Sequence, residues 1–196
     1  HTEFVAKGSY IALPQVSSER RQFIPIAYLD AQVMCGDKLR LLEGATPYHF
    51  GILTSTMHMA WMRAVAGRLE SRYQYSIHIV YNNFPWPENP ADKRIQAIEA
   101  ATQAVLDARQ VEMQRDARPT LAMLYHPDTM PAELAKAHAA LDKAVDAAYG
   151  YQGGKDDASR VAYLFGLYQQ LTAPLAPSPV PVPTARRKRA PGADNS

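Results

Sequence analysis

The spacing of apolar positions changes along this chain. In its opening part, apolar residues come in short β-prone runs at 9–16 and 22–29, with a polar turn between them. Two such runs joined by a turn predict a β-hairpin. Residues 31–35 and 38–42 predict two shorter strands on either side of a Gly-Asp turn. A small sheet is therefore expected at the start of the chain.

Farther along, apolar residues recur at helical spacing. Thr46 and Pro47 predict the start of a helix, because Thr is a favourable N-cap and Pro is tolerated in the first turn. Gly67 is expected to end this helix as its C-terminal cap. Residues 76–81 then alternate as a strand does and run into two prolines. The apolar stripe of the helix, its expected buried face, consists of Tyr48, Ile52, Leu53, Met57, Ala60, Trp61, Ala64 and Val65.

Three more amphipathic helices are predicted at about 95–113, 131–150 and 156–171. They suggest a small bundle, or a helical layer against the first region. The proline-rich and basic segment 174–196 is expected to be disordered. The predicted fold class is α+β: a small mixed sheet-and-helix domain over 1–87, a three-helix domain over 88–173, and the tail.

Composition narrows the class of protein. With 196 residues, 47% of them hydrophobic, the chain can bury a substantial core. Its single cysteine, Cys35, excludes a disulfide framework, and no apolar run approaches the roughly 20 residues that cross a bilayer. We therefore expect a cytoplasmic protein with no membrane contact. The chain has no starting Met, so we expect it to be part of something longer. Its net charge of +2 is small for a protein that wraps duplex DNA alone.

Catalytic and cofactor motifs are absent from the sequence. It contains no glycine-rich dinucleotide or phosphate loop, no HExxH and no paired Cys-x-x-Cys. His138 and Asp142 are four residues apart on one helix, and we expect a hydrogen-bonded pair at the helix surface. No catalytic residue, metal ligand or cofactor-binding residue is assigned to this chain.

The segment 82–87, NNFPWP, is similar to the Asn-Pro-Pro-aromatic loop with which enzymes methylate the exocyclic amine of adenine. Phe84 stands where the first Pro should be, and no glycine-rich cofactor loop precedes it. We interpret the segment as a structural corner that buries Phe84 and Trp86 between the two domains.

A basic and aromatic segment follows Gly67. Cations bind phosphates and base edges, and flat rings stack on bases, so this segment is the main candidate for DNA contact. Its candidate residues are Arg68, Arg72, Tyr73, Tyr75 and Ser76. The alternative interpretation is a solvated charge run beside tyrosines of the core.

Four other basic residues are further candidates for DNA contact. Arg20 and Arg21 lie in the turn of the expected hairpin, Lys7 precedes a glycine, and Arg63 lies on the polar side of the long helix. The alternative interpretation of each is a surface charge that aids solubility. The basic cluster 186–189 in the tail would add salt-sensitive attraction to DNA, or has no role.

Several blocks of the sequence resemble the MmeI-like family of single-chain restriction–modification proteins and DNA adenine methyltransferases. They occur in the family's order over about residues 1–172. The blocks are IALP at 11–14, VSSERR at 16–21, FIPI at 23–26, YHFG at 48–51, HMAW at 58–61, GRL at 67–69, YQYS at 73–76, VYNNFPWP at 80–87, HAALDKAVDAAYG at 138–150 and RVAYLFGLY at 160–168. His49, His58 and Trp61 match the pattern too, and we interpret them as structural.

The resemblance implies that 1–87 belongs to a target-recognition domain and 88–173 to the C-terminal helical domain. In the family, a separate Rossmann-like domain binds S-adenosylmethionine and carries the catalytic loop, and some members also have a nuclease. The implied function is sequence-specific recognition and positioning of double-stranded DNA within an adenine-specific methyltransferase of a bacterial cytoplasm. The implied partner is the catalytic domain of the same protein.

A second hypothesis belongs to another class of protein. The acidic helical region and the proline-rich tail are also features of a helical protein-interaction module, or of a free-standing specificity module. A complete methyltransferase is a third possibility, which the missing cofactor loop argues against. The sequence leaves the recognised DNA site and any cleavage activity open.

Overall fold

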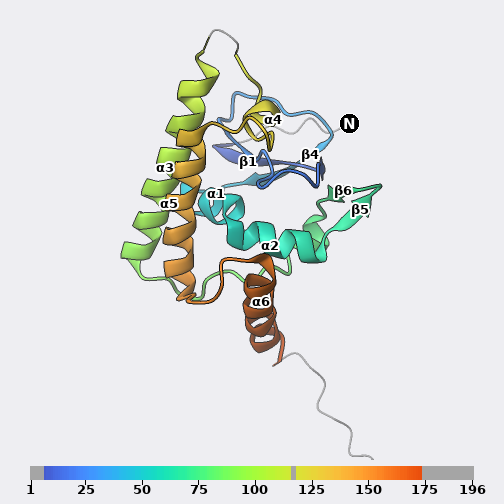
Figure 1. The fold of residues 1–196 in the computed structure, drawn as a ribbon, viewed down its shortest axis with the longest axis vertical. Helices are drawn as coiled ribbons and strands as arrows, with labels where there is room; N and C mark the ends of the chain where they lie inside the picture. Colours follow the sequence, from blue (N-terminus) through green and yellow to red (C-terminus); the bar gives the residue numbers. More distant parts are fainter. Residues whose placement is uncertain (1–6, 116–117, 174–196) are drawn as a thin grey trace, which may run out of the picture.

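The computed structural model describes residues 7–115 and 118–173. Strand β1 (Tyr10–Pro14) is the centre of an antiparallel sheet with β3 (Ala27–Leu29) on one side and β4 (Leu39–Glu43) on the other (Figure 1). The predicted pairing of the first two apolar runs and the strand within 38–42 are confirmed. The strand predicted at 31–35 is wrong. This segment is a turn with an exposed Met34, and its Val33 carbonyl accepts a hydrogen bond from the Tyr10 hydroxyl.

A second small sheet begins within the connection between β1 and β3. The two-residue strand β2 (Val16–Ser17) pairs with β6 (Arg72–Gln74), which forms a hairpin with β5 (Gly67–Leu69). The Tyr75 backbone N–H donates to the Gln15 carbonyl oxygen at 2.8 Å. This bond fixes the second sheet to the end of the first.

The long helix is divided into α1 (Pro47–Thr54) and α2 (Thr56–Val65). The predicted start is confirmed, with Thr46 as N-cap and Pro47 in the first turn. The predicted cap at Gly67 is wrong: α2 ends at an extended Ala66, and Gly67 already pairs with Gln74 in the hairpin. Extended backbone at Ala66 carries the chain directly from the helix into β5.

The strand predicted at 76–81 is also wrong. Residues Ile77–Tyr81 form a single π-helical segment, η1, with Ser76 as its N-cap. The Asn83 side-chain amide donates to the carbonyl oxygens of His78 and Ile79 at 2.8 and 3.0 Å. The Trp61 indole N–H donates to the Val80 carbonyl oxygen at 3.0 Å. These bonds to the backbone carbonyls hold the wide helical turn.

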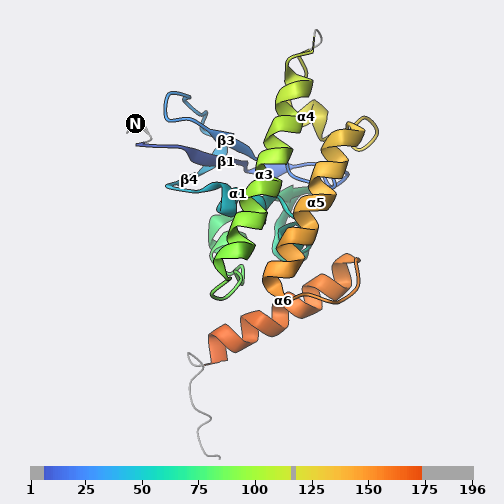
Figure 2. The same ribbon diagram turned by 90° about the vertical axis from the view of Figure 1, so that its left-hand side faces the viewer.

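The three predicted amphipathic helices are confirmed as α3 (Asp92–Met113), α5 (Ala132–Tyr149) and α6 (Asp157–Thr172). Gly150 caps α5 in the left-handed conformation with φ of 64°, and Asp156 caps α6. A short α4 (Leu121–Leu124) precedes α5. Figures 1 and 2 show α3 and α5 side by side, with α6 crossing below the end of α5. The tail 174–196, expected to be disordered, lies outside the described residues. Within the described ranges, no helix is long and apolar enough to cross a membrane.

Buried side chains from both sides of residue 88 form one core. Trp61 is buried as predicted, and so is Phe84, which contacts the rings of His58 and Tyr149. Trp86 is half-buried. Because these contacts cross from α2 to α5, the aromatic corner joins the first region to the helical region. The division into domains at 87 stays a prediction.

The surface pair expected between His138 and Asp142 does not form. The His138 side chain is buried, and its Nε2 atom lies 2.7 Å from the Tyr125 hydroxyl. Asp142 instead accepts a hydrogen bond of 2.7 Å from the backbone N–H of Thr56, and a second from the Thr56 hydroxyl. This face of α5 packs inward, so both side chains bind residues that lie far away in the sequence.

Candidate nucleic-acid interface

The β5–β6 hairpin presents Arg68 and Arg72 at the surface of the molecule. The Arg68 guanidinium carbon lies 3.8 Å from the centroid of the Tyr73 ring, which is its cross-strand neighbour. The Arg68 Nη1 group also donates to the Ser71 carbonyl oxygen at 2.8 Å. Stacking and a hydrogen bond together restrict the guanidinium, so its remaining donors are pre-oriented.

Arg72 is balanced by an acidic neighbour in the hairpin turn. Its Nη2 atom lies 2.7 Å from the Glu70 carboxylate, and both side chains are exposed. Glu70 has φ of 58°, a left-handed conformation that is costly for a residue other than glycine. The turn therefore places Glu70 next to Arg72.

The two tyrosines of the segment pack into the protein interior and so hold the hairpin in place. Tyr73 and Tyr75 are buried. The Tyr75 hydroxyl lies 2.9 Å from Nε2 of His58, and burial raises the pKa of Tyr75. Burial also lowers the pKa of His58 to about 3, so this histidine is neutral. As predicted, His58 is a buried, hydrogen-bonded histidine. Ser76 holds the π-helix through its side-chain oxygen.

Next to the hairpin lies a depression of about 290 Å³ where the two sheets meet the π-helix. Its lining includes Arg40 of β4 and Gln74 of β6. Both residues are exposed, and neither side chain has a hydrogen-bond or ion-pair partner among residues 7–115 and 118–173. Gln15 also lines the depression, with its amide donating to the Asp37 carbonyl oxygen at 2.9 Å. These guanidinium and amide groups are the types that read base edges.

The structure places Arg20 and Arg21 against the helical region. The Arg20 guanidinium lies 3.2 Å from the Asp128 carboxylate, with both side chains largely exposed. Arg21 donates to the Ala122 carbonyl oxygen at 3.4 Å, a long bond to α4. The turn that carries them follows β2, the strand paired with β6. They therefore extend from the same sheet as Arg72, on its far side from β5.

Lys7 and Arg63 lie outside the hairpin. Lys7 is exposed near the end of β4, where its backbone N–H donates to Glu43 at 3.2 Å. Arg63 is engaged within the protein. It forms an ion pair of 2.7 Å with Asp157 of α6 and donates to the Gln22 carbonyl oxygen at 3.1 Å.

Sequence reasoning missed Arg40, Gln74 and Gln15. Alternation within the hairpin strand contained part of the signal, because Arg72 and Gln74 are exposed while Tyr73 and Tyr75 are buried. No local sequence pattern marks Arg40 or Gln15 as a candidate for DNA contact. They reach the hairpin only through strand pairing and the bond between Tyr75 and Gln15.

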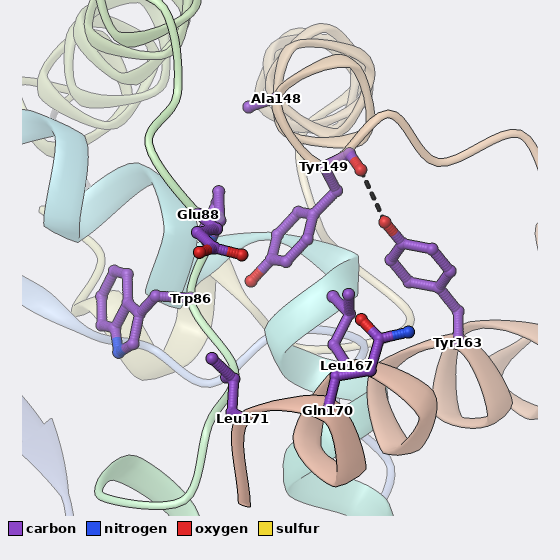
Figure 3. Close-up of a pocket in the computed structure, with 9 residues that line it drawn as sticks. Trp86, Glu88, Ala148, Tyr149, Tyr163, Leu167, Gln170 and Leu171 are labelled. Atoms are coloured by element: carbon purple, nitrogen blue, oxygen red, sulfur yellow. Dashed lines mark hydrogen bonds between the residues drawn. The ribbon is translucent and has the colours of Figure 1, made fainter. Parts of the chain in front are cut away.

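A second depression, of about 410 Å³, lies between the segment after Phe84, the end of α5 and α6 (Figure 3). The Tyr149 hydroxyl donates to the Pro85 carbonyl oxygen at 2.9 Å, and the Tyr163 hydroxyl to the Tyr149 carbonyl oxygen at 2.6 Å. Its lining includes Glu88 and no cation. This depression is therefore unsuited to phosphate. In the described ranges no cluster of His, Cys, Asp or Glu suits a metal ion.

Comparison with known proteins assigns both halves of the chain. Residues 2–88 match the model of the MmeI target recognition domain, and residues 90–176 match that of the MmeI C-terminal domain. The chain therefore consists of a target recognition domain and a C-terminal domain. It belongs to the MmeI family of restriction–modification proteins and DNA methyltransferases.

Two relatives support this assignment. DNA methyltransferase A of Bacillus subtilis (strain 168) is 41% identical over 162 residues, which cover 83% of this chain and 18% of that protein. The structure of the type IIL restriction–modification enzyme MmeI in complex with DNA is 47% identical, with a TM-score of 0.80. The match covers 87% of this chain and 22% of that enzyme. The chain thus spans less than a quarter of either relative.

Proposed function

We propose that this chain recognises a short sequence of double-stranded DNA for an adenine-specific DNA methyltransferase, in the cytoplasm of a bacterium. The methyl transfer belongs to another part of such a protein, where S-adenosylmethionine would bind. Family membership, the methyltransferase named among the relatives and the MmeI–DNA complex support this proposal. So does the absence of catalytic and cofactor motifs from the sequence.

One observation carries the proposal. The hairpin presents Arg72 and Gln74 on one face, where Gln74 lines a depression together with Arg40, and it presents Arg68 on the face of Tyr73. The side chains of Arg40 and Gln74 have no hydrogen-bond or ion-pair partner among the described residues. A two-stranded ribbon fits the major groove of B-DNA, where arginine pairs with guanine and glutamine with adenine through two hydrogen bonds each. The depression beside the hairpin gives Arg40 and Gln74 room to meet a base edge or a phosphate.

The other candidate residues take supporting roles in this proposal. Buried Tyr73 and Tyr75 position the hairpin, and Ser76 fixes the turn that follows it. Arg20 is exposed enough to exchange Asp128 for a phosphate, and Lys7 offers an exposed side chain. These two would strengthen binding without reading sequence. The catalytic part would then extrude the target adenine from the positioned duplex.

Two substitutions, Arg68→Ala and Arg72→Ala, test the proposal with a fluorescently labelled duplex that contains the preferred site. If an arginine touches a base, its loss weakens binding by about 1–3 kcal/mol and relaxes specificity at one position. If it touches only phosphate, affinity falls equally for all DNA sequences. The plot of the logarithm of the binding constant against the logarithm of salt concentration then becomes shallower by about 1.

Arg115→Ala is the matched control, because Arg115 is an exposed arginine at the end of α3 that pairs with Glu112. It should leave binding unchanged. Unchanged binding by both hairpin variants would overturn the assignment of the hairpin to DNA.

A further inference from the structure

A buried guanidinium lies between the first sheet and the helical region. Arg109 of α3 is only 3% exposed. Its Nε group donates to the Tyr125 hydroxyl and its Nη1 group to the Ile26 carbonyl oxygen, both at 2.7 Å. Its Nη2 atom is buried and has no hydrogen-bond partner among the described residues. The guanidinium is thus held firmly while the N–H donors of Nη2 are unused.

No carboxylate balances this charge within residues 7–115 and 118–173, where none of the ion pairs includes Arg109. The titratable groups that interact with it among these residues, Tyr125 and His138, supply no negative charge. Burial raises the pKa of Tyr125, while burial and the charge of Arg109 lower the pKa of His138 to about 3. A buried cation without a counter-charge is costly, so a carboxylate brought to it would be bound strongly.

Arg109 lines a depression of about 340 Å³ that could admit such a group. The other walls are largely apolar. They come from Tyr28 and Leu29 of β3, Leu106 and Met113 of α3, and Leu121 of α4. A ligand here would therefore combine an apolar body with a carboxylate.

Strand β3, which forms one wall, is an edge strand. It pairs with β1 on one side, and no described segment pairs with its other side. Figure 2 shows β3 at the margin of the first sheet, with α3 beside it. A free strand edge next to an apolar depression is suited to an extended peptide, which adds a strand and places alternate side chains into the depression.

We propose that this depression binds an extended peptide segment that pairs with β3 and places an Asp or Glu carboxylate against Arg109, between two apolar side chains. This chain spans only 18% and 22% of its relatives, so the proposed occupant is a segment of the part of such a protein that lies outside these 196 residues. The site is separate from the hairpin and does not depend on DNA. It would join the recognition and C-terminal domains to another part of the protein.

A pair of synthetic peptides tests this proposal with the whole 196-residue chain. One is acetyl-Leu-Thr-Glu-Thr-Leu-amide, whose two Leu and one Glu share a face of a strand, and the other has Gln in place of Glu. Binding is followed by NMR through the amides of Ala27–Leu29 and the Nε–H of Arg109. The Glu peptide should shift these signals and bind at least about tenfold more tightly than the Gln peptide.

Two variants assign the preference to this site. Arg109→Gln should abolish it, and Gln110→Glu should abolish it without disturbing the core. Gln110 is exposed and lines the same depression, so its new carboxylate would repel the carboxylate of the Glu peptide there. Gln96→Glu is the matched control, since it adds the same charge at an exposed position of α3 outside the depression.

Equal binding of the two peptides, or shifts confined to residues outside the depression, would overturn the proposal. So would a preference that survives Gln110→Glu. DNA binding by the hairpin is unaffected by either result, so failure here is distinguishable from failure of the proposed function.

Discussion

Glu70 opposes DNA binding in the proposed interface, and its replacement by Gln should strengthen binding. Its carboxylate lies 2.7 Å from Arg72 at the tip of the hairpin, with the side chains 77% and 46% exposed. The substitution keeps the shape of the side chain. It removes one negative charge from the surface that meets phosphate, and it releases Arg72 from its ion pair.

The size of the effect follows from the exposure of the pair. Two unit charges about 7 Å apart in water interact by roughly 0.6 kcal/mol, and salt reduces this further. A freed Arg72 adds at most about one phosphate contact. Together these terms predict a gain of about 0.5–1 kcal/mol, which is roughly a two- to fivefold lower Kd. Folding stability should change by less than about 1 kcal/mol, because exposed ion pairs contribute little.

Fluorescence anisotropy with a labelled mixed-sequence duplex, between about 50 and 200 mM salt, measures this gain. Glu133→Gln is the control, since Glu133 is an exposed glutamate paired with Lys136 on α5, away from the hairpin. It should leave the Kd unchanged. If Glu70→Gln leaves the Kd unchanged or raises it, the hairpin tip does not face DNA and our reasoning is wrong.

Two further predictions concern stability and are measured by urea unfolding. Gly51→Ala should destabilise the fold by about 3 kcal/mol, because an added Cβ would lie 2.3 Å from the Thr102 hydroxyl oxygen. Gly166→Ala in α6, where a Cβ meets nothing within 4 Å, should instead be neutral or slightly stabilising, and equal effects of the two would contradict the close packing of α1 on α3. His58 and His138 are kept neutral in the folded state by burial, which lowers the pKa of each from 6.5 to about 3. The unfolded chain takes up these protons first, so stability is complete above pH 6.5 and falls as the pH drops below it, by up to about 1.4 kcal/mol per unit for each histidine. A flat profile between about pH 7.5 and pH 5 would show that folding lowers the pKa of neither imidazole.

The helices with strong local signals could be predicted from the sequence. Apolar spacing defined α3, α5 and α6, while Thr46, Gly150 and Asp156 marked helix ends through capping chemistry that acts within a few residues. These signals are local, so they did not depend on how the chain folds as a whole.

The secondary-structure predictions were wrong where contacts with residues distant in the sequence determine the backbone conformation. Residues 76–81 alternate like a strand, yet Trp61 and Asn83 bind their carbonyl oxygens and stabilise a π-helix. The helix break at Ser55 has a similar origin. Asp142 of α5 accepts the N–H of Thr56 and so supplies a carboxylate at the start of α2. Neither contact is visible in local sequence.

The candidate interface was predicted in part. The basic segment contains Arg68 and Arg72, which lie in one exposed hairpin, but its sequence did not separate exposed residues from buried tyrosines. Arg40 comes to the hairpin by pairing opposite Leu13, across a connection that the sequence alone did not define. The assignment of Arg68 and Arg72 to DNA is a prediction that binding experiments must test.

The most direct test of the central claim is selection from a pool of randomised duplexes. The chain is incubated with the pool, and the retained DNA is sequenced. Our account predicts enrichment of one short DNA motif. When Arg68 or Arg72 is replaced by Ala, base specificity should be relaxed for at least one position of that motif. Retention of the pool without any enriched motif, or the same motif for the chain and both variants, would contradict sequence recognition by the hairpin.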